Sequence, residues 1–126
     1  MNRVYVRKIF HHDVTHEVSV RTDITQNFFG RISEFHVRGK RTGTEGTVKI
    51  NNATDPRFGG ALKSIIAAEG FVEEDEIILF HKKGTADYLL EIIRFDDERF
   101  SKLSALFSGK ERHCILSESD LENILR

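Results

Sequence analysis

The stretch RISEFHVRGKRTGTEGTVKINN, residues 31–52, combines five basic side chains with two adjacent asparagines. Lysine and arginine contact phosphate oxygens, arginine also pairs with O6 and N7 of guanine, and asparagine pairs with N6 and N7 of adenine. Gly39 and Gly43 lie among the basic residues and predict a flexible loop whose backbone can approach a ligand closely. The stretch therefore predicts binding of a polyanion, with an ordinary solvated loop as the alternative.

A second group of polar residues follows at the expected start of a helix near Asp55. Asn51, Asn52, Thr54 and Arg57 lie there, and the free N–H groups of a helix start bind phosphate oxygens well. Two polar segments would then flank a groove. The alternative is that the asparagines only form turns and cap the helix.

The histidine-rich stretch HHDVTH, residues 11–16, contains imidazole and carboxylate groups that can bind zinc. On a strand, however, His11 and His12 would face opposite sides. No cysteine pair or H-E-x-x-H helix completes a site. We therefore expect neither a bound metal nor a cofactor.

Two other pairs of residues are weak catalytic candidates. His113 and Cys114 are neighbours on a predicted strand and point apart, which favours a buried thiol over a nucleophile. Asp87 and Glu91 share a strand face, but Ile93 stands where a metal-dependent nuclease would need a lysine. The chain is predicted to be non-catalytic, with no catalytic residue.

Charge is distributed unevenly along the chain. Residues 1–66 carry eleven Lys and Arg against six Asp and Glu, and residues 67–126 carry eight against fourteen, although the formal net charge is only −1. This polarity indicates an anionic partner for the first half. The alternative is that the charges segregate in sequence but mix in space.

The length of 126 residues predicts one domain, residues 1–126, with its own core. The single cysteine and the lack of a long apolar run indicate a cytoplasmic protein without membrane contact. The last predicted helix has few apolar residues, which suggests that the chain was trimmed from a longer one.

Seven short apolar runs predict strands and suggest a barrel or a sandwich. Phe35 and Val37 alternate with polar residues, as in a half-buried strand, whereas EIILF and YLLEII are nearly continuous, as in strands buried on both faces. The strands are expected at residues 3–10, 17–22, 33–38, 46–51, 76–82, 87–95 and 112–116.

Helices are expected between the strands. Asp55 and Pro56 are typical of a helix start, and Gly70 of a helix end. A second helix is expected over residues 96–109 and a third over 117–126, and residues 22–30 are expected to form one turn with a capping box. The runs EIILF and YLLEII should pair as a hairpin. The expected centre of its core is Ile77, Leu79, Leu89 and Ile92.

The order of these parts resembles the DNA-binding pseudobarrel family, known from plant B3 transcription factors and from the effector domains of EcoRII-type and NgoFVII-type restriction enzymes. The resemblance runs from Asp23 to Phe95. Its most specific piece is INN, residues 50–52, followed by a helix and then GFVEEDEIILFHKKGTADYLLEII, residues 70–93. It implies a mainly β fold with short helices, a seven-stranded open β-barrel.

In this family two loop arms grip the major groove of double-stranded DNA. By position, the first arm falls within residues 23–41 and the second within residues 51–57. The residues expected to contact DNA are Gln26, Asn27, Arg31, Arg38, Lys40, Arg41, Lys49, Asn51, Asn52, Thr54 and Arg57.

We therefore expect a sequence-selective module for double-stranded DNA, the recognition domain of a bacterial restriction or defence protein whose nuclease lies in another domain or subunit. One alternative is a reader of RNA or modified bases, with an aromatic pocket made by Phe28, Phe29 and Phe35. The others are a protein-interaction domain and a metal-dependent nuclease. The main interpretation requires that the basic side chains converge on one concave wall.

Overall fold

The computed structural model describes residues 3–71 and 74–126, and over these ranges the chain forms seven strands and five short helices. The strands are β1 Arg3–Lys8, β2 Glu34–Gly39, β3 Glu45–Asn51, β4 Arg57–Phe58, β5 Ile77–Gly84, β6 Asp87–Ile93 and β7 His113–Ser117. The helices are α1 His11–Thr15, α2 Thr22–Asn27, α3 Ala61–Ala68, α4 Phe100–Ser104 and α5 Glu118–Leu125.

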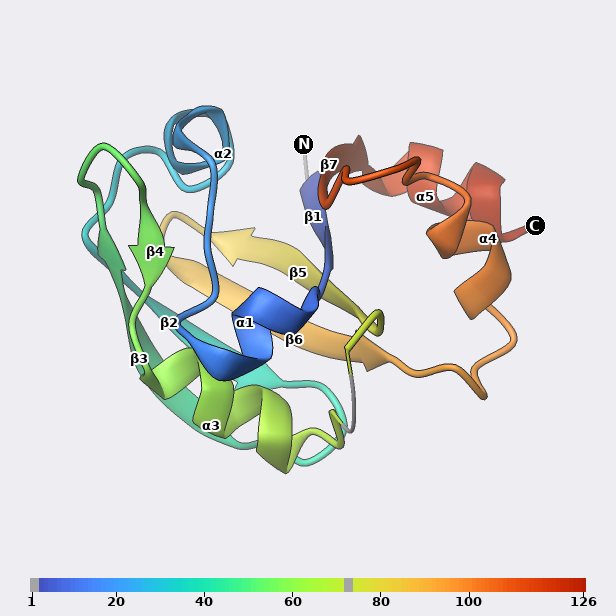
Figure 1. The fold of residues 1–126 in the computed structure, drawn as a ribbon, viewed down its shortest axis with the longest axis horizontal. Helices are drawn as coiled ribbons and strands as arrows, with labels where there is room; N and C mark the ends of the chain where they lie inside the picture. Colours follow the sequence, from blue (N-terminus) through green and yellow to red (C-terminus); the bar gives the residue numbers. More distant parts are fainter. Residues whose placement is uncertain (1–2, 72–73) are drawn as a thin grey trace.

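These strands belong to one curled sheet in the order β4-β3-β2-β6-β5-β1-β7 (Figure 1). Neighbouring strands pair antiparallel, except that β2 and β6 run parallel. The predicted fold class, mainly β with short helices and a seven-stranded open barrel, is confirmed. The predicted hairpin is also confirmed, because β5 pairs with β6.

Both faces of β1 and β5 are covered, which explains why their sequences are nearly continuous apolar runs. Because side chains alternate along a strand, Tyr5 and Phe80 enter one core together with residues of α2 and α3. Val6 and Leu79 enter a second core on the opposite face, which α4 and α5 cover (Figure 1). The chain after Phe95 thus closes the outer side of the sheet.

The centre of the hairpin differs in part from the prediction. Ile77 is fully buried, as is Leu79, but Leu89 and Ile92 are only half-buried. On β6 the fully buried positions include Tyr88 and Leu90, which point into the first core. The continuous apolar run concealed which alternate residues face inward.

The strand predicted at residues 17–22 is wrong. The segment is extended, and Val18 and Val20 are buried, but Ser19 makes only an isolated bridge to Arg57. The N–H and carbonyl of Ser19 bind the side chains of Asp13 and Arg7 instead of a neighbouring strand. Helix α2 then begins at Thr22.

The helix predicted to start at Asp55 is also wrong in its first turn. Helix α3 begins only at Ala61, because the residues before it make other contacts. Phe58 of β4 pairs with Ile50 of β3, and the Pro56 carbonyl accepts the Val20 N–H. Leu62, Ile65 and Ile66 of α3 are buried, as is Phe58 of β4, and Gly70 has a positive φ of 102°, as expected for the residue that ends a helix.

The two predicted C-terminal helices are present at the expected positions, but one of them is shorter than predicted. Helix α4 covers only five residues of the predicted range 96–109. Helix α5 begins after Ser117, which forms a capping box with Asp120. Val72 and Glu73, part of the stretch 70–93 that carries the resemblance, lie outside the described residues. Over the described ranges, no helix is long and apolar enough to cross a membrane.

A buried ion pair joins β1 to α1, and its hydrogen bonds also hold the segment that leads to α2. The Arg7 guanidinium contacts the Asp13 carboxylate at 2.8 Å, and both side chains are 0% exposed. Arg7 also donates to the Ser19 carbonyl, and Asp13 accepts the Phe10 and Ser19 N–H groups. Burial would raise the pKa of the Asp13 carboxyl, but the charge of Arg7 and these hydrogen bonds outweigh it and hold the pKa below its ordinary value.

We expect Asp13→Ala to lower the free energy of unfolding by about 3–5 kcal/mol, because it leaves a buried guanidinium unpaired. Urea unfolding at neutral pH measures the loss. The matched control is Asp23→Ala, which breaks an Arg–Asp pair whose side chains are 56% and 49% exposed and should cost less than about 1 kcal/mol. Equal losses in the two variants would show that the buried pair has no special role.

Candidate nucleic-acid interface

A groove of about 290 Å³ separates α2 from the connection between β3 and β4. Figure 1 shows these two segments at the same end of the molecule. We call this the arm groove; it is lined by Thr22, Thr25, Gln26, Arg31, Asn52, Ala53 and Pro56. Three predicted DNA-contacting residues, Gln26, Arg31 and Asn52, therefore meet in one depression, although 26 sequence positions separate the first from the last.

The end of α2 is held by polar contacts from three distant strands. The Arg3 guanidinium donates to the Asn27 carbonyl at 2.7 Å, and the Lys82 ammonium donates to the Phe28 carbonyl at 3.0 Å. The Tyr88 hydroxyl also donates to the Phe28 carbonyl, at 3.4 Å. The expected capping box at the other end is wrong, because Arg21 occupies the N-cap and makes no side-chain cap hydrogen bond.

Arg31 lies on the rim of the arm groove in a conformation that favours glycine. Its φ is 61°, and its N–H donates to the Thr25 carbonyl at 2.7 Å, which turns the chain sharply after α2. Its side chain is exposed, and among the described residues the guanidinium forms no hydrogen bond or ion pair. A cation with free donors therefore borders the groove.

The two adjacent asparagines have different contacts. Asn52 Nδ2 donates to the Ile32 carbonyl at 3.2 Å, so the Asn52 amide is held beside the groove. Asn51 Oδ1 accepts the Ala53 N–H at 3.2 Å, which is the turn role considered for it. Neither caps a helix, because α3 begins nine residues beyond Asn52.

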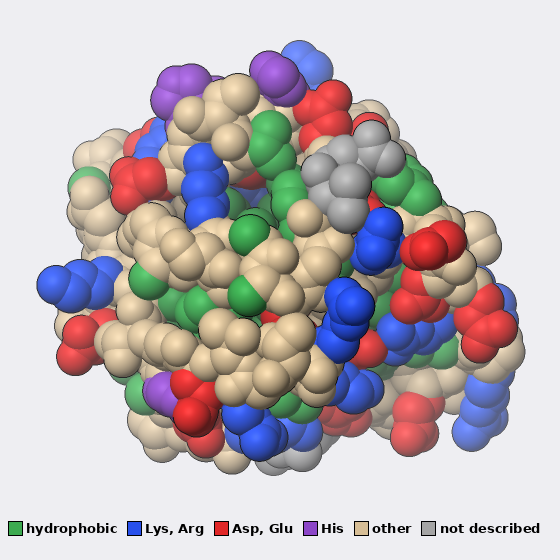
Figure 2. Space-filling model, turned by 90° about the horizontal axis from the view of Figure 1, so that it is seen from below, with side chains coloured by type: hydrophobic (Ala, Val, Ile, Leu, Met, Phe, Trp, Pro, Cys, Tyr) green, Lys and Arg blue, Asp and Glu red, His purple; other side chains and the backbone are tan. Residues whose placement is uncertain are grey.

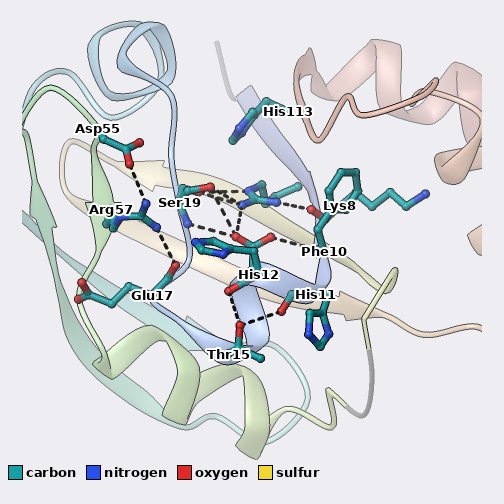
Figure 3. Close-up of polar contacts among 12 residues, drawn as sticks. Lys8, Phe10, His11, His12, Thr15, Glu17, Ser19, Asp55, Arg57 and His113 are labelled. Atoms are coloured by element: carbon teal, nitrogen blue, oxygen red, sulfur yellow. Dashed lines mark hydrogen bonds and ion pairs between the residues drawn. The ribbon is translucent and has the colours of Figure 1, made fainter.

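The remaining residues of the second arm lie beside the groove. The Arg57 guanidinium contacts the Asp55 carboxylate at 2.7 Å and the Glu17 carbonyl at 3.4 Å (Figure 3). Thr54 is exposed. Lys49 and Asn51 line an adjoining hollow of about 440 Å³, and its other lining residues are Glu17, Ser33, Glu34, Ile50 and Gly59.

Arg38, Lys40 and Arg41 do not lie at the arm groove. In the β2–β3 hairpin Glu34 pairs with Lys49 near the groove, whereas Arg38 pairs with Glu45 near the opposite end. The expectation that all the basic side chains converge on one wall is therefore wrong. Figure 2 views the molecule from the end that carries α3, and Lys and Arg are interspersed there with Asp and Glu.

The glycine-containing turn after β2 is anchored rather than free. The buried Glu69 carboxylate accepts the N–H groups of Arg41 and Thr42 at 2.7 and 2.8 Å. A Cβ at Gly39 would lie 2.2 Å from the Glu69 carboxyl, so this glycine makes room for the anchor and not for a ligand. Burial would raise the pKa of Glu69, but the hydrogen bonds from Thr42 and Arg41 hold it below its ordinary value.

The two carboxylates considered for a nuclease are engaged in separate ion pairs. Asp87 contacts His36 at 2.9 Å, and the hydrogen bond that the His36 imidazole donates to the Asp87 carboxylate raises the pKa of that imidazole. Glu91 contacts Arg99 at 2.8 Å, Lys40 at 3.6 Å and His81 at 3.4 Å. Burial would raise the pKa of Glu91, but the hydrogen bonds from His81 and Arg99 and the charges of Arg99 and Lys40 lower it to about 2.

The histidine-rich stretch forms helix α1 rather than a strand. His12 and His16 stack with ring centroids 4.3 Å apart, and Asp13 is occupied by Arg7. Within residues 3–71 and 74–126, no group of three or more His, Cys, Asp or Glu could hold a metal ion. His113 Nδ1 contacts the Tyr5 hydroxyl at 2.6 Å rather than Cys114.

The aromatic residues proposed for a base pocket are buried. Phe28 and Phe29 are 0% exposed and Phe35 is 1% exposed, and they contact one another in the first core. They therefore leave no free face on which an unstacked base could lie. The lining of the arm groove contains no aromatic side chain.

Arg3, Lys82 and Ser19 support the site but were not predicted from the sequence. Each acts through a contact with a distant segment, and Arg3 and Lys82 are neighbours only through the order of β1 and β5 in the sheet. No local sequence signal marks such a contact, because it depends on the pairing of strands more than 60 residues apart.

No protein-family model matches the sequence, and no curated protein matches it. Among solved structures, the chain is similar to the N-terminal domain of Helicobacter pylori LlaJI.R1, with a TM-score of 0.85 and 30% sequence identity. The match covers 92% of this chain and 98% of that chain. The similarity therefore extends over nearly the whole fold.

The low pKa of Glu91 makes the stability of the fold depend on acid pH. Because the pKa falls from 4.5 to about 2 on folding, the carboxylate stabilises the fold above about pH 4.5, and this stabilisation is lost as the pH falls toward 2. We expect Glu91→Gln to lower the free energy of unfolding by on the order of 2 kcal/mol at neutral pH and by less near pH 3.

Urea unfolding at both pH values checks this expectation. The matched control is Glu98→Gln, because Glu98 is exposed and lies in the connection between β6 and α4, close to Glu91 in the sequence. The control should follow the wild-type pH curve. A Glu91→Gln curve parallel to the wild type at every pH would contradict the assignment.

Proposed function

The chain belongs to the same family as the N-terminal domain of Helicobacter pylori LlaJI.R1, and from this premise we propose that it is a domain that binds double-stranded DNA. The domain reads sequence through the arm groove. Arg31 and the amides of Gln26 and Asn52 face base edges in the major groove, while Lys49, Thr54, Arg57 and Asn27 lie along the phosphates. This is the two-armed grip of the pseudobarrel family.

The observation that carries this proposal is the free guanidinium of Arg31, which lines one groove with two side-chain amides. Of the basic residues expected to contact DNA, Lys40 and Arg57 pair with carboxylates, and Arg41 donates to the Glu69 carbonyl. Arg31 has no such partner among the described residues and lines the same groove as Gln26 and Asn52. Guanidinium and amide groups together form the donor and acceptor set that recognises base edges.

The similarity supports the same function. The similar domain belongs to LlaJI.R1, a restriction-type protein. We therefore propose that this chain is the non-catalytic recognition domain of a restriction protein and that the nuclease lies in another domain or subunit. The pairing of Asp87 and Glu91 with basic side chains supports a structural role for these two carboxylates.

The groove favours duplex DNA over the alternatives. A reader of single-stranded RNA or of an extruded base needs an aromatic face for stacking. Phe28, Phe29 and Phe35 are buried, and the groove lining contains no aromatic side chain. Base edges that remain stacked in a duplex require no such face.

The salt dependence of binding tests which cations contact phosphate. If Lys49 and Arg57 are the cations that contact phosphates, the logarithm of the affinity should fall against the logarithm of the salt concentration with a slope of about −2. If Arg38, Lys40 and Arg41 at the far end also contact the duplex, the slope should approach about −5. Fluorescence anisotropy with a selected duplex at several salt concentrations measures it, and a flat response would exclude phosphate binding.

Arg31→Gly separates binding from folding. Because the φ of Arg31 is 61°, glycine fits this position, and the free energy of unfolding should change by less than about 1 kcal/mol. Affinity for a selected duplex should fall by about 1–3 kcal/mol, with relaxed preference at one base pair. The matched control is Arg38→Ala, another exposed arginine without an ion pair among the described residues. Equal effects of the two variants would contradict the assignment of the groove.

A further inference from the structure

We propose that the arm groove selects an adenine through Asn52, next to a guanine read by Arg31, and that methylation of that adenine at N6 blocks recognition. This inference rests on the proposed function. It adds the bases that are read and a chemical modification that controls reading.

The contact with Ile32 fixes the orientation of the Asn52 amide. A carbonyl oxygen can only accept a hydrogen bond, so the atom that contacts the Ile32 carbonyl at 3.2 Å must be Nδ2. Nδ2 carries two hydrogens, and one remains free after this contact. Oδ1 forms no hydrogen bond with any described residue. Asn52 therefore offers one donor and one acceptor side by side, without reorganisation of its side chain.

This donor and acceptor pair matches adenine in the major groove. Adenine presents the N7 acceptor beside the N6 donor, whereas guanine presents two acceptors. Cytosine presents a donor without the adjacent acceptor, and thymine an acceptor with a methyl group. Asn52 Oδ1 can accept the N6 hydrogen while Nδ2 donates to N7, so adenine is the base that satisfies both atoms.

Arg31 complements this reading because it lines the same groove with unpaired donors. Guanidinium groups bind O6 and N7 of guanine with two parallel hydrogen bonds. Since both residues border one depression of about 290 Å³, the two bases should be adjacent or separated by about one base pair. Gln26 supplies a second amide for the neighbouring base pair.

N6-methylation acts on the contact that Asn52 makes. In a base-paired adenine, the remaining N6 hydrogen is used in the Watson–Crick pair, so the methyl group projects into the major groove on the N7 side. It then occupies the place from which Asn52 Oδ1 would accept a hydrogen. The modified base offers neither the donor nor the space, and Asn52 Oδ1, which loses its water in the complex, is left unpaired.

Asn51 is a matched control within the same dipeptide. Its Oδ1 already accepts the Ala53 N–H, and its side chain lines the adjoining hollow rather than the arm groove. Asn51→Ala removes the same side-chain amide from the neighbouring position, so a difference between the two variants isolates the contact that Asn52 makes.

The experiment selects bound duplexes from a random pool with the wild type, Asn52→Ala, Asn51→Ala and Arg31→Lys. The wild type should select an adenine and a guanine next to each other. Asn52→Ala should lose the adenine preference by roughly tenfold and keep the guanine preference, and Arg31→Lys should do the reverse. Asn51→Ala should select as the wild type does. Thermal unfolding of each variant identifies any loss of folding, and unfolded variants are replaced by Asn52→Ser and Asn51→Ser.

The selected duplex is then synthesised with N6-methyladenine at the selected position. Its affinity for the wild type should fall by roughly tenfold or more, and its affinity for Asn52→Ala should be unchanged. If the wild type binds a selected duplex but Asn52→Ala keeps the adenine preference, or the methylated duplex binds equally well, the inference is overturned while the proposed function stands. If the wild type binds no duplex, the proposed function fails, and the inference fails with it.

Discussion

The buried contact between Arg7 and Asp13 determines where the segment before α2 lies, and the arm groove depends on that segment. Arg7 and Asp13 bind the backbone of Ser19. On either side of Ser19, the Val18 carbonyl accepts the Phe58 N–H and the Val20 N–H donates to the Pro56 carbonyl. One desolvated ion pair between β1 and α1 thus fixes the approach to both walls of the groove, because α2 follows residue 21 and Pro56 lines the opposite wall.

Local patterns predicted the elements whose conformation depends on their own residues. The alternation at Phe35 and Val37 and the paired apolar runs of β5 and β6 appear in the structure as expected. The strand at 17–22 was wrong because side chains from another segment bind the backbone of Ser19 in place of a neighbouring strand. The start of α3 was wrong because strand pairing takes Phe58 out of the helix. Both errors arise from long-range contacts that no local pattern contains.

Long-range strand pairing also explains why the predicted site residues lie in two separate places. Arg31 and Arg38 are close in sequence, but β2 runs between them and carries Arg38 toward the end where Glu69 anchors the next turn. Arg31 and Asn52 are far apart in sequence, but the pairing of β2 with β3 returns the chain to the same end. The charge division between the halves also does not become one basic wall, since Lys40 pairs with Glu91 of the second half.

The conformation of Arg31 suggests why this residue is suited to recognition rather than to stability. A bulky residue in the left-handed region costs on the order of 1 kcal/mol, and glycine would remove that cost. An exposed cation without a partner among the described residues gains little from the fold itself. Its free donors match the paired acceptors that a guanine edge presents to a guanidinium, which is the ligand proposed for it. Asn52 is held by Ile32 and the backbone of Arg31 is turned by the Thr25 carbonyl, so these parts of the groove are already ordered in the free chain, and the proposed binding of DNA would need less ordering there.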